Sequence, residues 1–182
     1  MTQEEGMLLL KIARSAIEAH LSQHPFVLPE VRNPALWERR GAFVTLNTKG
    51  HLRGCIGRVE PTTPLIQTVS QMAMEAAFND PRFMPLRKEE LSSVALEVSV
   101  LSLLKKIHDV GEVKVGRDGL LIQRDFASGL LLPQVAREFH WSKEEFLTQT
   151  CIKAGLESEA WKEEKTEIHT FTAEVFSETE KF

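Results

Sequence analysis

Apolar residues at helical spacing predict several helices in this chain. Positions 9–20, 65–77 and 146–154 repeat apolar residues every three or four positions, as in a helix that buries one face. Before the first of these stretches, Thr2 and Glu5 have the spacing of a capping box, in which each side chain bonds the other residue's backbone amide. The predicted helices cover residues 3–23, 64–79, 133–139 and 143–154.

Alternation of apolar and polar residues predicts strands between these helices. The clearest case is residues 94–100, where every second position is apolar. Turn-forming residues at 47–50 and 125–128 each separate two short apolar segments, which is typical of hairpins. The predicted strands cover residues 42–46, 51–59, 94–100, 120–124, 129–132 and 166–176. Because strands and helices mix without a regular strand-helix-strand repeat, the sequence predicts an α+β fold with an antiparallel or mixed sheet flanked by helices.

Composition narrows the class of protein. The chain has 182 residues, a net charge of −4 and scattered lysines and arginines, which disfavours nucleic acid as a partner. No apolar run approaches the ~20 residues that a membrane-spanning helix needs. The two cysteines, Cys55 and Cys151, lie far apart and form no zinc-binding or disulfide pattern. We therefore expect a cytoplasmic protein with reduced thiols, with no metal site and no cofactor evident from the sequence.

The hexapeptide LRGCIG at residues 52–57 carries the most distinctive chemistry. In an extended strand, Arg53 and Cys55 point to the same face, and a guanidinium beside a thiol favours the reactive thiolate. Gly54 and Gly57 lack a β-carbon, so a ligand or another backbone can come close. Cys55 is thus a candidate nucleophile or covalent carrier; the alternative is a buried cysteine that acts as a small apolar residue.

Arg53 itself has two interpretations. It is a candidate anchor for a carboxylate or a phosphate, since a guanidinium matches both geometries. Alternatively, it forms an ion pair across the sheet, for instance with Glu97. We favour the binding role because Arg53 shares the face of Cys55.

A second cluster, NDPRF at residues 79–83, follows the helix predicted at 64–79. Asp80, Arg82 and Phe83 are candidates to line the same site, with Asp80 moving protons and with Arg82 and Phe83 contacting a ligand. The alternative is that Asp80 forms a turn and pairs with Arg82, which fixes the exit of the helix. Both can hold together.

No general base can be assigned to Cys55 from the sequence. His51 lies roughly 13 Å along the strand from Cys55, too far for a direct hydrogen bond. His108 and His140 are distant in the chain and stay open as candidates. His20 and His24 have the spacing of a metal pair, but no third ligand stands out, and histidine at a helix C-terminus is sufficiently explained by the helix dipole.

Several blocks, taken in order, resemble the AMMECR1 domain family. They are LRGCIG at 52–57, AAFNDPRF at 76–83, GRDGLLI at 116–122, GLLLPQVA at 129–136, and CIKAGL at 151–156 with Trp161 downstream. The resemblance implies a two-lobed α+β fold in a single domain covering residues 1–182. We place the larger lobe at about 1–105 plus 156–182 and the smaller lobe at about 106–155. The family resemblance implies no settled reaction. It suggests a modification or synthesis pathway shared with Memo-like and radical-SAM proteins.

Three functions follow from these observations. The first is an enzyme, or the small-molecule-binding component of one, with a cleft at the strand of residues 52–57. The second is a scaffold or adaptor for a partner protein, which predicts a sealed Cys55 and a large exposed apolar patch. The third, RNA binding linked to RNA modification, is disfavoured by the net charge of −4.

Overall fold

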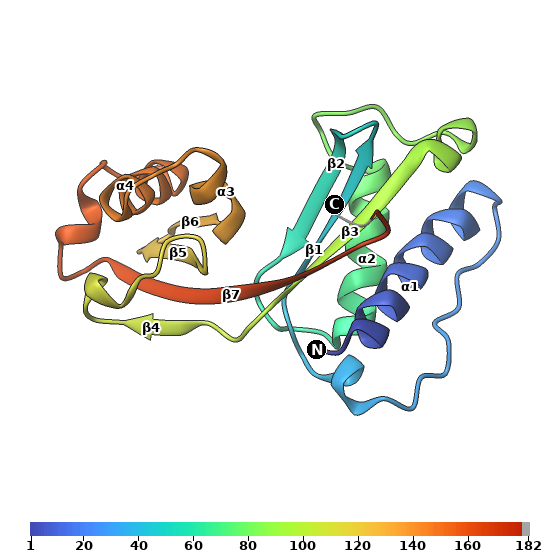
Figure 1. The fold of residues 1–182 in the computed structure, drawn as a ribbon, viewed down its shortest axis with the longest axis horizontal. Helices are drawn as coiled ribbons and strands as arrows, with labels where there is room; N and C mark the ends of the chain where they lie inside the picture. Colours follow the sequence, from blue (N-terminus) through green and yellow to red (C-terminus); the bar gives the residue numbers. More distant parts are fainter. Residues whose placement is uncertain (180–182) are drawn as a thin grey trace. The chain divides into compact units, whose positions relative to one another are not determined.

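The structure, a computed structural model, describes residues 1–179 and divides them into two compact units. The first unit contains residues 1–101 and the chain from Glu174 onward; the second contains residues 102–173 (Figure 1). Residues 156–173, expected in the larger lobe, thus belong to the second unit. The reason is that the strand starting at Glu167 pairs with other strands of that unit. Residues 180–182 of the expected lobe lie outside the described residues.

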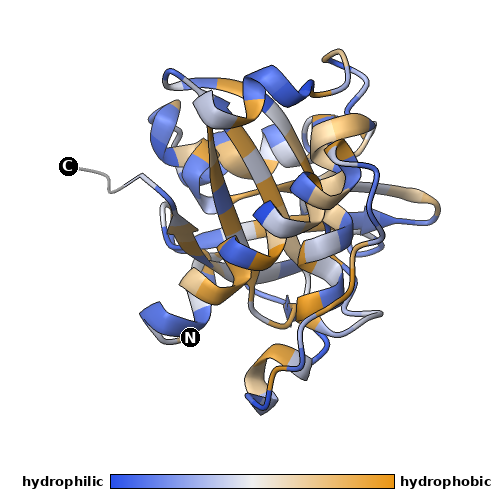
Figure 2. Cartoon of the chain, turned by 90° about the vertical axis from the view of Figure 1, so that its right-hand side faces the viewer, coloured by the Kyte–Doolittle hydropathy of each residue, from blue (hydrophilic) through white to orange (hydrophobic). Residues whose placement is uncertain are grey.

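The first unit is an antiparallel sheet with two helices on one face, and the end of β7 (Glu167–Ser177) joins this sheet beside its third strand. Its strands follow the order β2 (His51–Arg58), β1 (Ala42–Thr48) and β3 (Val94–Leu101). The helices α1 (Gln3–Leu21) and α2 (Leu65–Phe78) pack together and against this sheet. Figure 2 shows apolar positions alternating with polar ones along the strands, the pattern of a sheet buried on one face.

The core of the first unit lies between the sheet and the helices. Alternate residues of β1 and β3 are buried there, while α1 and α2 contribute the apolar faces that their spacing predicted. The capping box at the start of α1 is also confirmed: Glu5 N–H donates to the Thr2 hydroxyl, and Thr2 N–H donates to the Glu5 carboxylate. The predicted α+β class is therefore correct.

The second unit has its own core and contains the remaining strands of the sheet. Its strand order is β4 (Lys105–Ile107), β7 (Glu167–Ser177), β5 (Asp118–Arg124) and β6 (Ala127–Leu131), with β7 continuing into the first unit. The helices are α3 (Pro133–Glu138) and α4 (Lys143–Lys153). Cys151 is fully buried in this core, as its place on the apolar face of its helix predicted. Across the described residues of both units, no helix is both long and apolar enough to cross a membrane.

Both predicted hairpins form, with tighter turns than expected. Lys49 and Gly50 have φ values of 52° and 80° and connect β1 to β2 in two residues. The second turn was expected at 125–128, but the chain reverses within Asp125 and Phe126. Asp125 adopts a left-handed φ of 53°, which closes the turn within two residues. Ala127 and Ser128, which were expected in the loop, therefore pair with β5.

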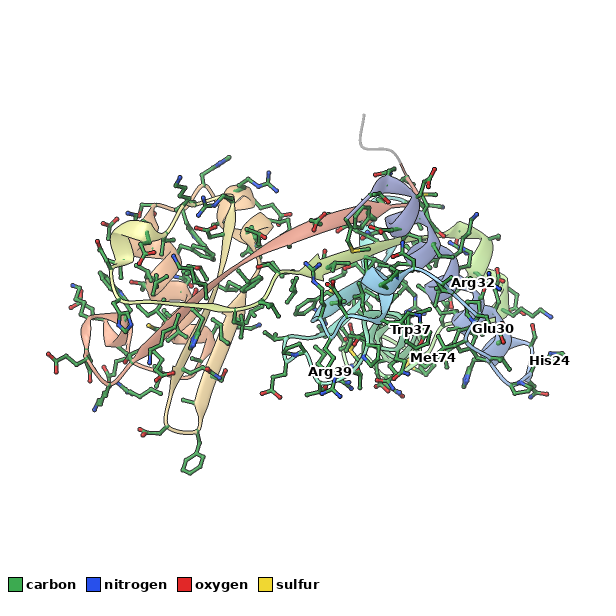
Figure 3. The ribbon with its side chains drawn as sticks, turned by 90° about the horizontal axis from the view of Figure 1, so that it is seen from below. His24, Glu30, Arg32, Trp37, Arg39 and Met74 are labelled. Atoms are coloured by element: carbon green, nitrogen blue, oxygen red, sulfur yellow. The ribbon has the colours of Figure 1, made fainter. Side chains whose placement is uncertain are left out.

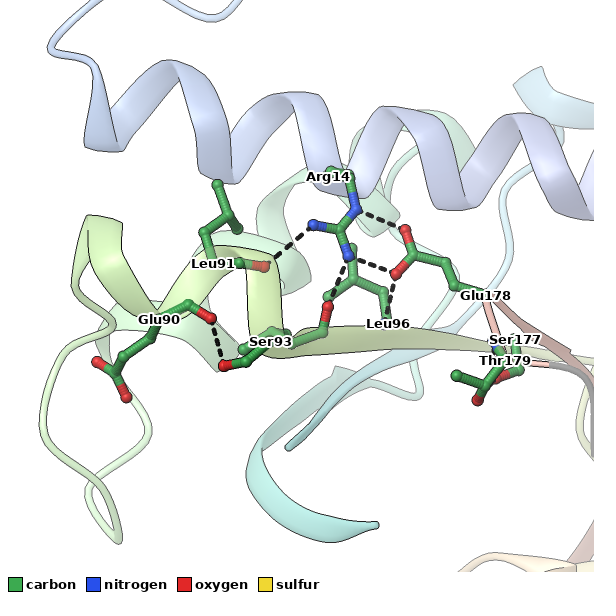
Figure 4. A network of polar contacts seen from close by, with 9 residues as sticks. Arg14, Glu90, Leu91, Ser93, Leu96, Ser177, Glu178 and Thr179 are labelled. Carbon is green, nitrogen blue, oxygen red and sulfur yellow. Dashed lines mark hydrogen bonds and ion pairs between the residues drawn. The ribbon is translucent and has the colours of Figure 1, made fainter. Parts of the chain in front are cut away.

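A half-buried ion pair fixes the segment after β7 to the first helix (Figure 4). Arg14 of α1 donates to the Glu178 carboxylate and, through Nη2, to the Val94 carbonyl at 2.8 Å. The same carboxylate accepts the Leu96 N–H of β3 at 2.8 Å. Because Glu178 serves both a helix and a strand, it secures the segment that follows β7.

Replacing Glu178 with glutamine is expected to lower the free energy of unfolding by about 1–2 kcal/mol. The amide keeps the shape but loses the charge-assisted bonds to Arg14, whose side chain is 26% exposed. Urea unfolding measures this loss, with the exposed Glu60→Gln as the matched control, expected to change stability by less than about 0.5 kcal/mol. Equal effects of the two substitutions would show that the Arg14 bonds contribute nothing.

Candidate functional site

Gly54 brings α2 into direct contact with β2. A β-carbon at Gly54 would lie 2.2 Å from the Ala76 carbonyl oxygen, closer than any real β-carbon contact. The glycine therefore lets the helix backbone rest on the strand. Two residues after α2 ends, Asp80 reaches the same strand, which places the NDPRF cluster beside the LRGCIG hexapeptide as the sequence suggested.

Asp80 holds both the backbone of Cys55 and the side chain of Arg82. Its buried carboxylate accepts the Cys55 N–H at 2.9 Å and the Nε and Nη2 groups of Arg82 at 2.9 and 2.7 Å. Arg82 Nη2 also donates to the Cys55 carbonyl at 3.1 Å. Hydrogen bonds from Arg82, followed by those from backbone amides, hold the pKa of the Asp80 carboxyl far below its usual range. Asp80 thus stays ionised, which fits the turn-forming interpretation and gives no support to its predicted role in moving protons.

The Cys55 thiol lies on the face of the sheet opposite the helices. Thr45 is its cross-strand partner on β1, and the Thr45 hydroxyl donates to Cys55 Sγ at 3.2 Å. Glu97 lies on the other side of Thr45, on β3, so the three residues form one row across the sheet. Burial raises the pKa of the half-buried Cys55 thiol, although the Thr45 hydrogen bond and the charge of Arg82 act in the opposite direction. At rest, the group is therefore a thiol and not the thiolate expected from the sequence.

Arg53 interacts with a different partner from the two that the sequence suggested. It donates Nε and Nη2 to the Glu90 carboxylate at 3.1 and 3.3 Å, so its ion pair is with the short 3-10 helix Lys88–Ser93 and not with Glu97. The cation beside Cys55 is Arg82. Leu46 pairs with Gly54 and the next residue, Asn47, pairs with Leu52, so Arg53 has no partner on β1. This bulge interrupts the simple alternation of side chains on which the prediction relied.

Two guanidinium groups flank the ring of Phe83. The central carbon of Arg53 lies 6.0 Å from the ring centroid and that of Arg82 lies 5.5 Å from it. The Nη1 atom of Arg53 is buried and has no hydrogen-bond partner among the described residues. The structure thus brings Arg53 and Arg82 together at the ring of Phe83.

The second glycine of the hexapeptide, Gly57, has a different role from Gly54. A β-carbon there would lie 2.2 Å from the ring of Phe43, the cross-strand neighbour of Gly57. The missing side chain is therefore filled by an aromatic ring of this protein. The structure offers no support for ligand contact at Gly57 itself.

The histidines do not supply a base within the first unit. His51 is exposed at the start of β2, while His108 and His140 belong to the second unit. His20 packs its ring on Phe78 with centroids 4.2 Å apart, and His24 is exposed beyond the end of α1 (Figure 3). Among the described residues, no group of three metal-binding side chains occurs.

Two residues of the site escaped the sequence interpretation, Thr45 and Glu90. A two-residue turn at Lys49 and Gly50 with regular pairing would set Thr45 opposite Gly54. The bulge shifts the partner of Thr45 to Cys55. Glu90 could have been found only as one of several acidic residues in the 88–93 segment, where nothing in the pattern distinguishes it.

Comparisons with known proteins agree with this fold. A model of the AMMECR1 family matches residues 10–176. A protein of Methanothermobacter thermautotrophicus is 44% identical over 98% of this chain and 96% of its own length, and one of Thermococcus gammatolerans is 46% identical over 96% and 91%. The crystal structure of the uncharacterized protein PH0010 from Pyrococcus horikoshii matches with a TM-score of 0.91 and 42% identity, covering 98% of this chain and 93% of that one. This chain therefore belongs to the AMMECR1 family, as its sequence blocks predicted.

Proposed function

We propose that this protein is the small-molecule-binding component of an enzyme system and that it takes an anionic ligand beside Cys55. The observation that carries the proposal is the Asp80 carboxylate, which fixes the Arg82 guanidinium against the Cys55 backbone before any ligand arrives. A group already held in place loses little conformational entropy when it binds, and this favours affinity.

The unused donors of the site support an anion as its ligand. Arg82 donates Nε and Nη2 to Asp80, and Arg53 donates the same two groups to Glu90. Among the described residues neither Nη1 group makes a hydrogen bond, and that of Arg82 belongs to the more exposed side chain. Arg87 also pairs with Glu90, at 3.6 Å, so three arginines share two carboxylates in these ion pairs. Carboxylates and phosphates offer the acceptors that such guanidinium groups match.

Cys55 contributes a protonated thiol to this site. Thr45 is the one described side chain that hydrogen-bonds to Sγ, and a hydroxyl is too weak a base to remove the thiol proton. A role for Cys55 as nucleophile or covalent carrier therefore needs a base from the ligand or from a partner protein. Within this proposal, the Memo-like and radical-SAM proteins suggested by the family resemblance are candidate partners in the cytoplasm.

The proposal predicts stabilisation by an anion that depends on Arg82. Thermal unfolding of the full chain is followed against a panel of carboxylate and phosphate metabolites, for the wild type, for Arg82→Gln and for Arg39→Gln. Arg39 is an exposed arginine elsewhere in the first unit and serves as the matched control (Figure 3). A ligand present at ~100 times its Kd adds about 2.7 kcal/mol, which raises Tm by roughly 5–10 °C in a protein of this size.

The expected result is that at least one anion raises Tm in the wild type and in Arg39→Gln, and raises it less than half as much in Arg82→Gln. Equal stabilisation of all three proteins would place the anion elsewhere. No stabilisation by any anion, together with capture of a protein partner that Arg82→Gln does not weaken, would favour the adaptor alternative. A partner RNA released steeply by salt would favour the RNA-binding alternative.

A further inference from the structure

The strand β2 lies at one end of the sheet, so one of its two edges has no neighbouring strand. It pairs with β1 alone, and the order of the strands ends there (Figure 1). Such an edge can pair with another extended chain through backbone N–H and C=O groups. In an antiparallel ladder, every second residue of an edge strand directs these groups away from its partner strand. The next question is which residues of β2 do so.

Cys55 identifies the residues of β2 that face outward. Its N–H donates to the Asp80 carboxylate and its carbonyl accepts from Arg82 Nη2, so both groups point away from β1. The pairing with β1 is regular from Cys55 to Arg58, and the backbone groups of Gly57 therefore point the same way. Gly57 is half-buried, and its backbone makes no hydrogen bond outside this ladder within residues 1–179. The edge of β2 is thus closed at Cys55 and open at Gly57.

Asp80 and Arg82 stand where the next residue of an added strand would bond. The Asp80 carboxylate accepts the Cys55 N–H as the carbonyl of that residue would, and Arg82 Nη2 donates to the Cys55 carbonyl as its N–H would. Successive outward-facing residues of β2 lie about 7 Å apart. A chain that pairs with Gly57 can therefore continue for only one further residue toward Cys55 before it meets these two side chains.

The charge at this point determines which end of an added chain lies there. The Arg82 side chain is 54% exposed, and its Nη1 makes no hydrogen bond to the described residues. A chain antiparallel to β2 runs from Gly57 toward Cys55 and brings its C-terminal carboxylate to this guanidinium group. A parallel chain brings its ammonium group there instead, which Arg82 repels. The Asp80 carboxylate cannot compensate, because it is buried and both of its oxygens already accept hydrogen bonds.

We propose that the free edge of β2 binds the C-terminus of an extended peptide. The penultimate residue of the peptide pairs with Gly57 through its N–H and C=O, and the terminal carboxylate binds Arg82. This inference rests on the function proposed above, because it uses the same guanidinium group, and it specifies the anion as a peptide carboxylate. A phosphate or a simple carboxylate fits Arg82 as well but leaves the backbone of Gly57 unpaired.

A titration of the full chain with N-acetyl-alanyl-alanine, followed by NMR of the backbone amides, tests this proposal. Three compounds serve for comparison: acetate; the C-terminal amide of the peptide, which lacks the carboxylate; and the peptide methylated at the first alanine nitrogen, which lacks the N–H that faces Gly57. We expect the amide signal of Gly57 to shift with the parent peptide. We also expect the parent peptide to bind at least about tenfold more tightly than each of the other three.

Two variants place the binding on the protein. Arg82→Gln should weaken binding of the parent peptide at least about tenfold, because it removes the charged partner of the carboxylate, and Arg39→Gln should leave the affinity unchanged. The comparison of ligands uses the wild type alone, so it tests the proposal even if Arg82→Gln does not fold.

The contradicting results separate this inference from the function on which it rests. If acetate binds as tightly as the peptide and both need Arg82, the anion site stands and the peptide proposal is overturned. If no compound binds, both are contradicted. If the methylated peptide binds as well as its parent, Gly57 takes no part and the proposal is overturned. A dimer in sedimentation that protects the Gly57 amide from exchange would show that a second copy of the chain occupies the edge instead.

Discussion

Replacing Gly54 with alanine is expected to lower the free energy of unfolding by about 3 kcal/mol. The new methyl group would lie 2.2 Å from the Ala76 carbonyl oxygen, and a backbone atom inside a helix cannot rotate away as a side chain can. The helix must therefore shift from β2, which also pulls Asp80 away from the Cys55 N–H. Urea unfolding measures the loss of stability, and hydrogen exchange at the Cys55 amide measures the loss of that bond.

Gly57→Ala is the matched comparison for this substitution. Its β-carbon would also meet an atom at 2.2 Å, but that atom belongs to the ring of Phe43, which can change rotamer. We expect a smaller loss, about 1 kcal/mol, with the Cys55 amide still protected. If Gly54→Ala costs no more than Gly57→Ala and leaves exchange at Cys55 unchanged, the close approach of α2 and β2 does not position the site.

Asp80→Asn is expected to cost about 2–3 kcal/mol at neutral pH. The amide keeps the size of the carboxylate but loses its charge and brings an NH₂ group next to the donors of Cys55 and Arg82. Urea unfolding measures the cost. Asp125→Asn, in the exposed turn between β5 and β6, is the control and should change stability by less than about 0.5 kcal/mol.

The cost of Asp80→Asn should also depend on pH. The pKa of Asp80 is lowered on folding, so its ionised form stabilises the folded state above the unfolded-state pKa of about 3.9. That stabilisation declines as the pH falls below about 4, toward the lower folded-state pKa. The wild type should therefore lose its advantage over Asp80→Asn in acid. A difference that stays constant from pH 7 to pH 2 would show that the carboxylate charge has no part in the cluster.

Much of the fold follows from local sequence patterns. The structure contains α1 and α2, which apolar spacing predicts, and β3, which alternation predicts. Each of these elements forms because it buries one apolar face. The capping residues Thr2 and Glu5 mark the helix start for a similarly local reason. Such features depend on a few neighbouring residues and are therefore visible in one sequence.

The arrangement of the site depends on features that no local pattern reveals. The skipped residue at Arg53 changes the strand register, and this makes Thr45 the partner of Cys55. Whether a strand contains a bulge is decided by the tertiary contacts of both faces. The choice of Glu90 over Glu97 as the partner of Arg53 likewise depends on where a distant turn packs. The sequence therefore predicted Arg53 where the structure has Arg82 as the cation beside Cys55, and it did not reveal Thr45 or Glu90.

The most direct test of this account is the titration of the Cys55 thiol in three proteins: the wild type, Arg82→Gln and Arg53→Gln. Alkylation rates are followed against pH by mass spectrometry of the peptide that contains Cys55, which separates its signal from that of the buried Cys151. Because burial raises the pKa of Cys55 and the charge of Arg82 lowers it, the wild type should titrate above the ordinary cysteine value. Arg82→Gln should titrate higher still, and Arg53→Gln should match the wild type. A wild-type thiol that titrates below the ordinary value, or a rise with Arg53→Gln and none with Arg82→Gln, would contradict the assignment of Arg82 as the cation of the site.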